Sequence, residues 1–248
     1  MLRELATDRP DQTETPYTVD AGHFQIELDF ATYARDCDDS DGMDLRTREW
    51  TVAPVNLKVG LLNSVDLQFV LDTYAQTKVE NRVAQTSESD SGFGDVTTRL
   101  KINFWGNDGG ITAFGMMPFV KWPLPKSGLR NGRTEGGLIF PFASELPWGW
   151  DVGAMTEFDY NRDADGGGHH TEFVNTITFG RTIVGKLRGF LEFFSNVSTE
   201  RDSDWAGTVD FGVTYLLTEN LQLDGGCNIG VTNAAEDFKA FSGISMRF

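Results

Sequence analysis

The sequence predicts an all-β protein: a transmembrane antiparallel β-barrel of twelve strands with its N- and C-termini on the periplasmic side. Three observations lead to this prediction. Apolar and polar residues alternate with the two-residue period of a strand over most of the chain. The connections between these stretches are alternately short and long, and every tryptophan falls at a strand end.

The alternation is clearest at the end of the chain, FSGISMRF (241–248). Phe238, Ile244, Met246 and Phe248 share one face, and the opposite face is mostly polar. A strand that runs to the last residue needs a partner, because chain ends otherwise fray in solvent. Closure of a barrel against the segment 23–35 would supply the missing hydrogen bonds.

Turn residues divide the chain into twelve segments with strand character. Most exceed the five or six residues of an ordinary soluble strand and suit the roughly 9 to 11 residues that cross a bilayer core at a tilt. The segments lie near 23–35, 46–60, 63–79, 93–105, 109–122, 135–146, 149–161, 169–181, 185–198, 203–217, 220–232 and 236–248.

Short and long connections alternate along the chain, as periplasmic turns and external loops do in outer-membrane barrels. The short ones are 60–63, 105–110, 146–149, 182–186 and 218–220. The longer ones, charged or glycine-rich, are 36–44, 80–92, 123–135 and 161–169, joined by the acidic 199–204 and 232–237. A soluble sandwich does not require this pattern.

Aromatic residues predict two girdles that contact outer-membrane lipid. Trp50, Trp122 and Trp205 fall at the ends that face the long connections. The ends that face the short turns carry Trp105, Trp148, Trp150 and Tyr215. Core aromatics of a soluble protein would prefer strand centres.

The opposite parity predicts a polar lumen in which carboxylates outnumber bases. The lining residues we expect are Glu27, Asp29, Asp66, Asp72, Asp95, Arg99, Lys101, Glu157, Asp159, Arg188, Glu192, Asp210, Asp224, Lys239 and Arg247. These charges either brace a solvated interior or set ion preference through their local field. Arg99 and Lys101 are the expected partners of the acidic groups.

Composition excludes several other classes. The chain has 37 Asp and Glu against 21 Lys and Arg, a net charge of −16, and it lacks the basic clusters that phosphate binding requires. Nucleic acid is therefore not an expected partner. The sequence contains no apolar run of the roughly 18 to 20 residues that a membrane helix needs.

Catalysis and metal binding have little support in the sequence. His169 and His170 stand together in a glycine-rich connection, but no serine or cysteine accompanies them in a recognisable motif. No third metal ligand stands at a defined spacing from the pair. We therefore expect no enzyme activity, no cofactor and no metal.

Three prolines, Pro54, Pro118 and Pro141, interrupt predicted strands, where each removes a ladder hydrogen bond. They indicate either bulges that bend the wall or, for the last two, a local break through which an apolar solute leaves sideways. The first twenty residues have no sustained period and contain Pro10 and Pro16. The domain prediction is therefore an extended periplasmic or lumenal segment, 1–20, followed by the barrel, 21–248, with Arg9 placed to meet the excess carboxylates.

The opening ATDRPDQTETPYTVDAGHFQIELDF (6–30) resembles that of the meta-pathway phenol-degradation family of outer-membrane transporter-like proteins. Further likenesses are SGFGDVTTRLKINFW (91–105), MMPFVKWPLPKSG (116–128), FLEFFS (190–195) and NLQLDGGCNIGVT (220–232). The resemblance implies a barrel in the bacterial outer membrane and passage of aromatic or other small hydrophobic compounds. The terminal aromatic on the last strand also resembles the signal read by the outer-membrane assembly machinery.

The sequence thus favours a channel or transporter for small solutes with a polar, net acidic lumen. The alternatives are a lipid-modifying enzyme carried by the barrel, dependent on His169 or His170, and a structural outer-membrane protein. The sequence leaves open which solute passes and whether residues 1–20 plug the lumen.

Overall fold

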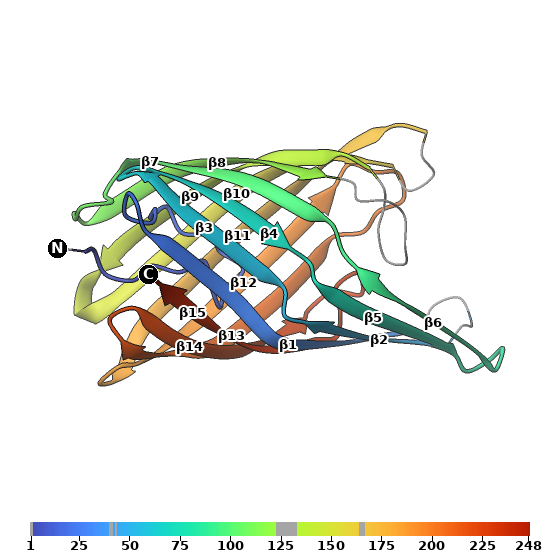
Figure 1. Ribbon diagram of the computed structural model, residues 1–248. Helices are drawn as coiled ribbons and strands as arrows, with labels where there is room; N and C mark the ends of the chain where they lie inside the picture. The colour runs from blue at the N-terminus through green and yellow to red at the C-terminus, as the bar shows by residue number, and fades with distance from the viewer. Residues whose placement is uncertain (1, 40–41, 43, 123–132, 164–166) are drawn as a thin grey trace.

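The computed structural model describes residues 2–39, 42, 44–122, 133–163 and 167–248, which form one closed antiparallel sheet (Figure 1). Its strands are β1 (Phe24–Asp38), β2 (Leu45–Val52), β3 (Val55–Leu62), β4 (Val65–Leu71), β5 (Tyr74–Asn81), β6 (Thr86–Phe93), β7 (Val96–Trp105), β8 (Thr112–Trp122), β9 (Glu135–Leu146), β10 (Trp150–Arg162), β11 (His169–Val184), β12 (Leu187–Ser198), β13 (Ala206–Thr218), β14 (Leu221–Gly230) and β15 (Phe238–Arg247). A short 3-10 turn, η2 (Pro147–Gly149), joins β9 and β10.

These fifteen segments make the twelve strands that the sequence predicts, because three strands are each interrupted once. β2 and β3 are two halves of one strand, as are β4 and β5, and β6 and β7. β1 accordingly pairs with both β2 and β3 on one side and with β15 on the other. The predicted closed antiparallel barrel is confirmed.

The last strand, β15, pairs with the first, β1, as the alternation at the C-terminus predicts. The β1–β15 register runs from Gln25 opposite Arg247 to Arg35 opposite Phe238. Phe24 and Phe248 exchange both backbone hydrogen bonds, at 3.1 and 2.8 Å. N- and C-termini lie at the same end of the barrel, the end with the short turns (Figure 1).

The stretch 80–92 is not the loop that its composition predicts. β5 continues to Asn81 and β6 begins at Thr86, so most of the stretch is a paired hairpin that projects from the end opposite the termini (Figure 1). Nearly all of β6 is solvent-exposed, so burial imposes no apolar alternation there. Of the other long connections, 123–132 and 164–166 lie outside the described residues.

The three strand prolines have different consequences. Pro54 stands at the break between β2 and β3, next to Ala53 with its positive φ of 56°. Beside Pro118, the β7–β8 register passes from Arg99 opposite Phe119 to Ile102 opposite Met116. Beside Pro141, the β8–β9 register passes from Phe114 opposite Phe142 to Met117 opposite Ile139. The ladders on both sides of β8 are therefore interrupted near mid-strand.

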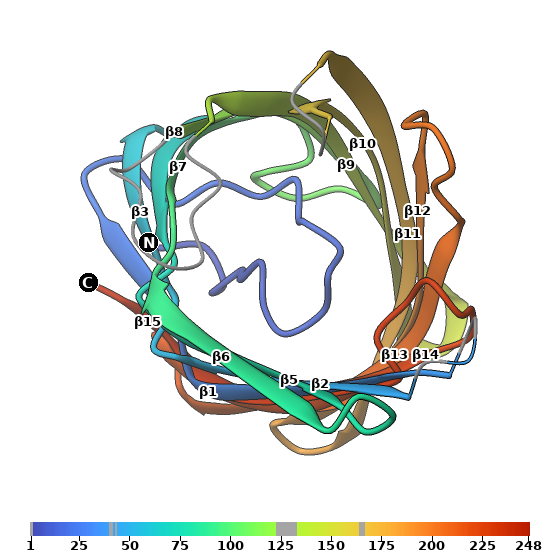
Figure 2. The ribbon, with the colours of Figure 1, turned by 90° about the vertical axis from the view of Figure 1, so that its right-hand side faces the viewer.

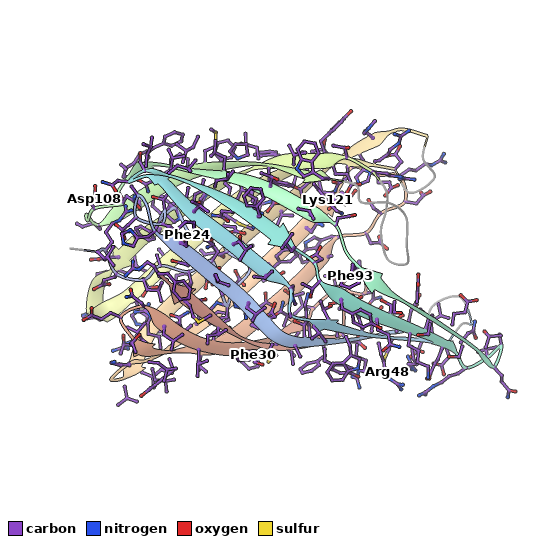
Figure 3. The ribbon with its side chains drawn as sticks, viewed as in Figure 1. Phe24, Phe30, Arg48, Phe93, Asp108 and Lys121 are labelled. Atoms are coloured by element: carbon purple, nitrogen blue, oxygen red, sulfur yellow. The ribbon has the colours of Figure 1, made fainter. Side chains whose placement is uncertain are left out.

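The outside of the barrel is apolar. Phe24 and Phe30 are 54% and 49% exposed, and Figure 3 shows side chains projecting around the whole wall. The seven aromatic residues expected in the girdles are all exposed: Trp50, Trp105, Trp122, Trp148, Trp150, Trp205 and Tyr215. Tyr33 packs against Trp50 with ring centroids 4.7 Å apart. Among the described residues, none belongs to a helix that is long and apolar enough to span a membrane.

Candidate functional site: the lumen and its N-terminal segment

The inner wall is polar and densely filled. Side chains that an open surface would leave in water are buried here, with Gln68 and Lys101 fully buried and Asp66, Glu192 and Asp210 each 1% exposed. Such burial requires partners, because an unpaired charge inside a protein is strongly destabilising. Most of the partners come from the N-terminal segment, residues 2–20.

This segment runs through the interior of the barrel without regular secondary structure, as the view along the barrel shows (Figure 2). Thr13, Pro16, Thr18 and Val19 are buried within it. Irregular backbone at membrane depth is tolerated only where protein or water surrounds it, because its polar groups need partners. The inward-facing side chains of the barrel provide them.

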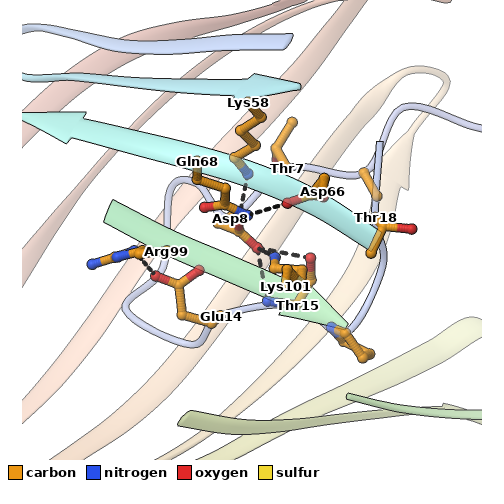
Figure 4. A network of polar contacts seen from close by, with 12 residues as sticks. Thr7, Asp8, Glu14, Thr15, Thr18, Lys58, Asp66, Gln68, Arg99 and Lys101 are labelled. Carbon is orange, nitrogen blue, oxygen red and sulfur yellow. Dashed lines mark hydrogen bonds and ion pairs between the residues drawn. The ribbon is translucent and has the colours of Figure 1, made fainter. Parts of the chain in front are cut away.

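Asp8 is the centre of a buried ion-pair cluster that joins the segment to the wall (Figure 4). Its carboxylate contacts Lys58 Nζ and lies 2.5 Å from Lys101 Nζ, while Lys58 also lies 2.5 Å from Glu27. Burial alone would raise the pKa of Asp8, but Lys101 and Lys58 outweigh it and hold that pKa well below its usual range. Asp8 also accepts hydrogen bonds from the backbone and hydroxyl of Thr15, which fold the segment back on itself.

Arg9 forms the second anchor, which the sequence analysis places correctly beside carboxylates. Its guanidinium reaches Asp29 on β1 at 2.6 Å and Asp224 on β14 at 2.7 Å. It therefore bridges the seam where the first and last strands close the barrel. The two carboxylates, of Asp29 and Asp224, accept from different N–H groups of the planar guanidinium.

Residues 12–14 of the segment make further polar contacts around the lumen. Gln12 donates from its backbone to Glu192 at 2.8 Å and from its side chain to Asp210 at 2.6 Å. Thr13 donates to Glu192 at 2.5 Å, and Arg99 donates to Glu14 at 2.6 Å. The segment is thus fixed to β7, β12 and β13 as well as to the β1 side.

One sector of the inner wall is apolar, which the sequence analysis missed. Met117, Ile139, Met155 and Val174 form a buried cluster across β8, β9, β10 and β11. Phe119 and Phe194 pack against this cluster. The segment passes close to it, because the backbone N–H of Glu14 lies 3.3 Å from Met155 Sδ. The sequence does contain a signal for this cluster: Met155 is two residues before Glu157 on the same strand, so both side chains point to the same, inner face.

A cavity of about 270 Å³ lies beyond the segment on the β1 side of the interior. It is lined by Asp29, Thr32, Ala34, Glu49, Thr51, Pro54, Asp72, Glu236 and Lys239. Four carboxylates against one lysine make it strongly acidic. We refer to this space as the vestibule.

The remaining lining residues occupy several small groups. Asp95 lies 3.9 Å from Lys121, Arg247 lies 3.4 Å from Asp20, and Arg188 pairs with Asp151 in a half-exposed position. Glu157 and Asp159 stand on β10 beside the Arg99 group. The most important residues that the sequence analysis did not single out are Asp8 and Lys58. Asp8 belongs to the opening stretch 6–30 that carries the family resemblance, and Lys58 follows the break at Pro54, which obscures its parity.

A closed barrel with an apolar exterior, exposed aromatic rings and a polar interior is an outer-membrane β-barrel. The chain matches, over residues 7–248, the family described as "Putative MetA-pathway of phenol degradation", and it belongs to that family. A search of curated proteins found no match.

Solved structures support the same fold at low sequence identity. The NanC porin shares 12% identity with a TM-score of 0.56, covering 88% of this chain and 98% of that one. The translocator domain of the autotransporter NalP from Neisseria meningitidis shares 9% identity with a TM-score of 0.56, covering 92% and 89%. The beta domain of the Bordetella autotransporter BrkA shares 12% identity with a TM-score of 0.55, covering 92% and 100%.

Proposed function

We propose that the protein is a gated outer-membrane channel for small solutes, in which the N-terminal segment is the gate. The observation that carries this proposal is the filling of a closed barrel by one terminal segment. That segment is held mainly through side-chain ion pairs and hydrogen bonds to the wall, centred on Asp8 and Arg9. Residues 2–20 take no part in the strand ladder, so the segment can leave the lumen without breaking that ladder.

The lining of the interior favours small aromatic or other hydrophobic compounds as solutes. The apolar cluster of Met117, Ile139, Met155 and Val174 faces a lumen that is otherwise polar. Binding sites for small molecules commonly combine an apolar lining with a few placed polar groups. Release of the segment would uncover this cluster next to Arg99 and Glu192, and the family description, which refers to phenol degradation, agrees with such cargo.

The orientation that we propose in the membrane rests on the different lengths of the connections at the two ends of the barrel. We place both termini and the short turns on the periplasmic side, and the β5–β6 hairpin and the other long connections outside the cell. The partners are then outer-membrane lipid around the aromatic girdles, small solutes in the lumen, and the assembly machinery at β15. The alternative of a lipid-modifying enzyme predicts turnover that depends on His169 or His170.

Planar-bilayer recording of the refolded protein tests the gate. Deletion of residues 2–16 is expected to convert a mostly closed channel into an open one, and to increase uptake of phenol-like compounds into liposomes. Heat-dependent gel mobility checks that the deleted form still closes its barrel. Unchanged conductance and uptake in a correctly folded deletion variant would refute the gate, and lipid hydrolysis by the wild type would favour the enzyme.

A further inference from the structure

Three side chains with metal-ligating atoms meet at the end of the barrel opposite the termini. Asp163 directly follows β10, His170 is the second residue of β11, and Glu200 follows β12. One ligand atom from each lies within 4.8 Å of the others. His170 Nδ1 is 3.0 Å from Asp163 Oδ1 and 3.9 Å from Glu200 Oε2.

The imidazole is fixed in this direction from its other side. His170 is only 8% exposed, and its Nε2 lies 3.2 Å from Glu172 Oε1. The second oxygen of Glu172 accepts a hydrogen bond from Asn196 Nδ2 at 3.0 Å. Metal-ligating histidines usually donate their second ring N–H to a carboxylate in this way, which sets the tautomer and leaves the first nitrogen free to bind.

Charge at the cluster also favours a cation. Three carboxylates, from Asp163, Glu172 and Glu200, surround one imidazole. Arg133 also lies at the cluster, where its Nη1 donates hydrogen bonds to the backbone oxygens of Arg162 and Asp163, at 3.5 and 2.5 Å. A divalent ion would stabilise these carboxylates and would link the β10–β11 connection to the connection that follows β12.

We propose that Asp163, His170 and Glu200 form a Zn²⁺ site at the outer mouth of the lumen, with Glu172 as the positioning residue for His170. One nitrogen and two carboxylate oxygens, with water in the fourth position, match the ligand types and number that zinc takes. Calcium would require about six to eight oxygen ligands. With zinc bonds of about 2.0 to 2.2 Å, tetrahedral ligand atoms stand roughly 3.3 to 3.6 Å apart. Asp163 Oδ1, at 3.0 Å from His170 Nδ1, would move slightly away, and Glu200 Oε2, at 3.9 Å, would move slightly closer.

The sequence alone could not reveal this site, because Glu200 follows β12 and reaches Asp163 and His170, at the two ends of the β10–β11 connection, only once these strands pair. The neighbouring His169 provides a matched control, since its ring stacks on Tyr160 at 4.7 Å with an interplanar angle of 5°. It is exposed, whereas His170 is buried.

Zinc affinity of the refolded barrel in detergent, measured by competition with a chelating dye, tests the proposal. We expect one equivalent of Zn²⁺, an affinity loss of at least about a hundredfold in His170→Ala and Asp163→Asn, and a loss of about 10- to 100-fold in Glu172→Gln. His169→Ala should bind like the wild type. Gel mobility of the folded barrel identifies any variant that fails to fold, and Glu200→Gln then serves as a second ligand variant.

Three results would overturn the site: no zinc binding by the folded wild type, equal losses in His169→Ala and His170→Ala, or tighter binding of Ca²⁺ than of Zn²⁺. The assay measures metal and not conductance. Its outcome is therefore independent of whether the barrel is a gated channel.

Discussion

The two sides of the lumen hold the N-terminal segment by different physical means. On the side of β1, β3 and β7, Lys58, Lys101 and Asp29 bind Asp8 and Arg9 through buried ion pairs. On the side of β8 to β11, the wall is mainly the apolar cluster, and the segment lies against it with a hydrogen bond between the hydroxyls of Thr13 and Thr176 but without an ion pair among the described residues. The ionic side therefore specifies where the segment docks, and the apolar side leaves a surface that a solute can use once the segment has gone.

Removing the lysines of the ionic side should have the largest effect. In the double variant Lys58→Met with Lys101→Met, Asp8 would be buried without a cation, which typically costs about 3 to 5 kcal/mol. Release of the N-terminal segment from the lumen returns Asp8 to water and removes that cost. The open fraction in bilayer recordings should therefore rise by about a hundredfold or more.

Two controls accompany this experiment. Arg188→Met breaks an ion pair that is half-exposed on both sides and should leave gating almost unchanged. Adding Asp8→Leu to the double lysine variant should restore much of the closed state. A closed channel in the double variant would show that the Asp8 cluster does not fix the segment.

The apolar side is tested by its effect on solute choice. Ile139→Ser with Met155→Ser, made in the channel that lacks residues 2–16, should reduce uptake of a phenol-like solute by at least about tenfold, because the loss of one apolar contact worth about 1.5 kcal/mol already corresponds to roughly that factor. Uptake of a small sugar should change little. Ile183→Ser, at an exposed position 61% accessible, is the matched control. Equal losses for both solutes would indicate a general change in the pore.

Acidic groups of the segment make docking sensitive to pH. Burial raises the pKa of Asp11 to about 7, and burial together with the charge of Asp8 raises the pKa of Glu14 to about 7. Released into water, both titrate near pH 4. Docking therefore favours their protonated forms, and this contribution is present below about pH 4 and is lost as pH rises through about 7.

Asp8 acts in the opposite direction, because its pKa is lowered on docking and its contribution disappears only as pH falls below about 4. The open fraction should accordingly increase by about tenfold or more between about pH 5 and pH 8. Asp11→Asn with Glu14→Gln should flatten the profile. An open fraction that falls with rising pH would contradict the assignment.

The sequence predicted the wall better than the contents of the barrel. Alternation, connection lengths and aromatic positions report on lipid on one side and water on the other, so strand number and closure follow from them. β6 was missed because it lies beyond the lipid, where both faces are wet. The partners of Asp8 are 50 and 93 residues away in the chain, and the barrel brings them to the segment. Glu200 likewise reaches His170 only through the pairing of β11 with β12.

The vestibule gives the smallest expected effect and a cleaner test of ion preference than the buried carboxylates. Asp66 and Asp210 bind Val19 and Gln12 of the segment, so neutralising them would disturb gating together with selectivity. Glu49, Asp72 and Glu236 line the vestibule together with Lys239, and the charges of Lys121 and Arg99 also reach Asp72. At separations below the Debye length of about 8 Å these carboxylates are poorly screened and should concentrate cations.

Glu49→Gln, Asp72→Asn and Glu236→Gln together should reduce the cation preference, measured as reversal potential across a salt gradient, by roughly half at low salt and less at high salt. Lys239→Gln should shift the potential in the opposite direction, and an anion preference in the wild type would show that the vestibule charges do not govern permeation.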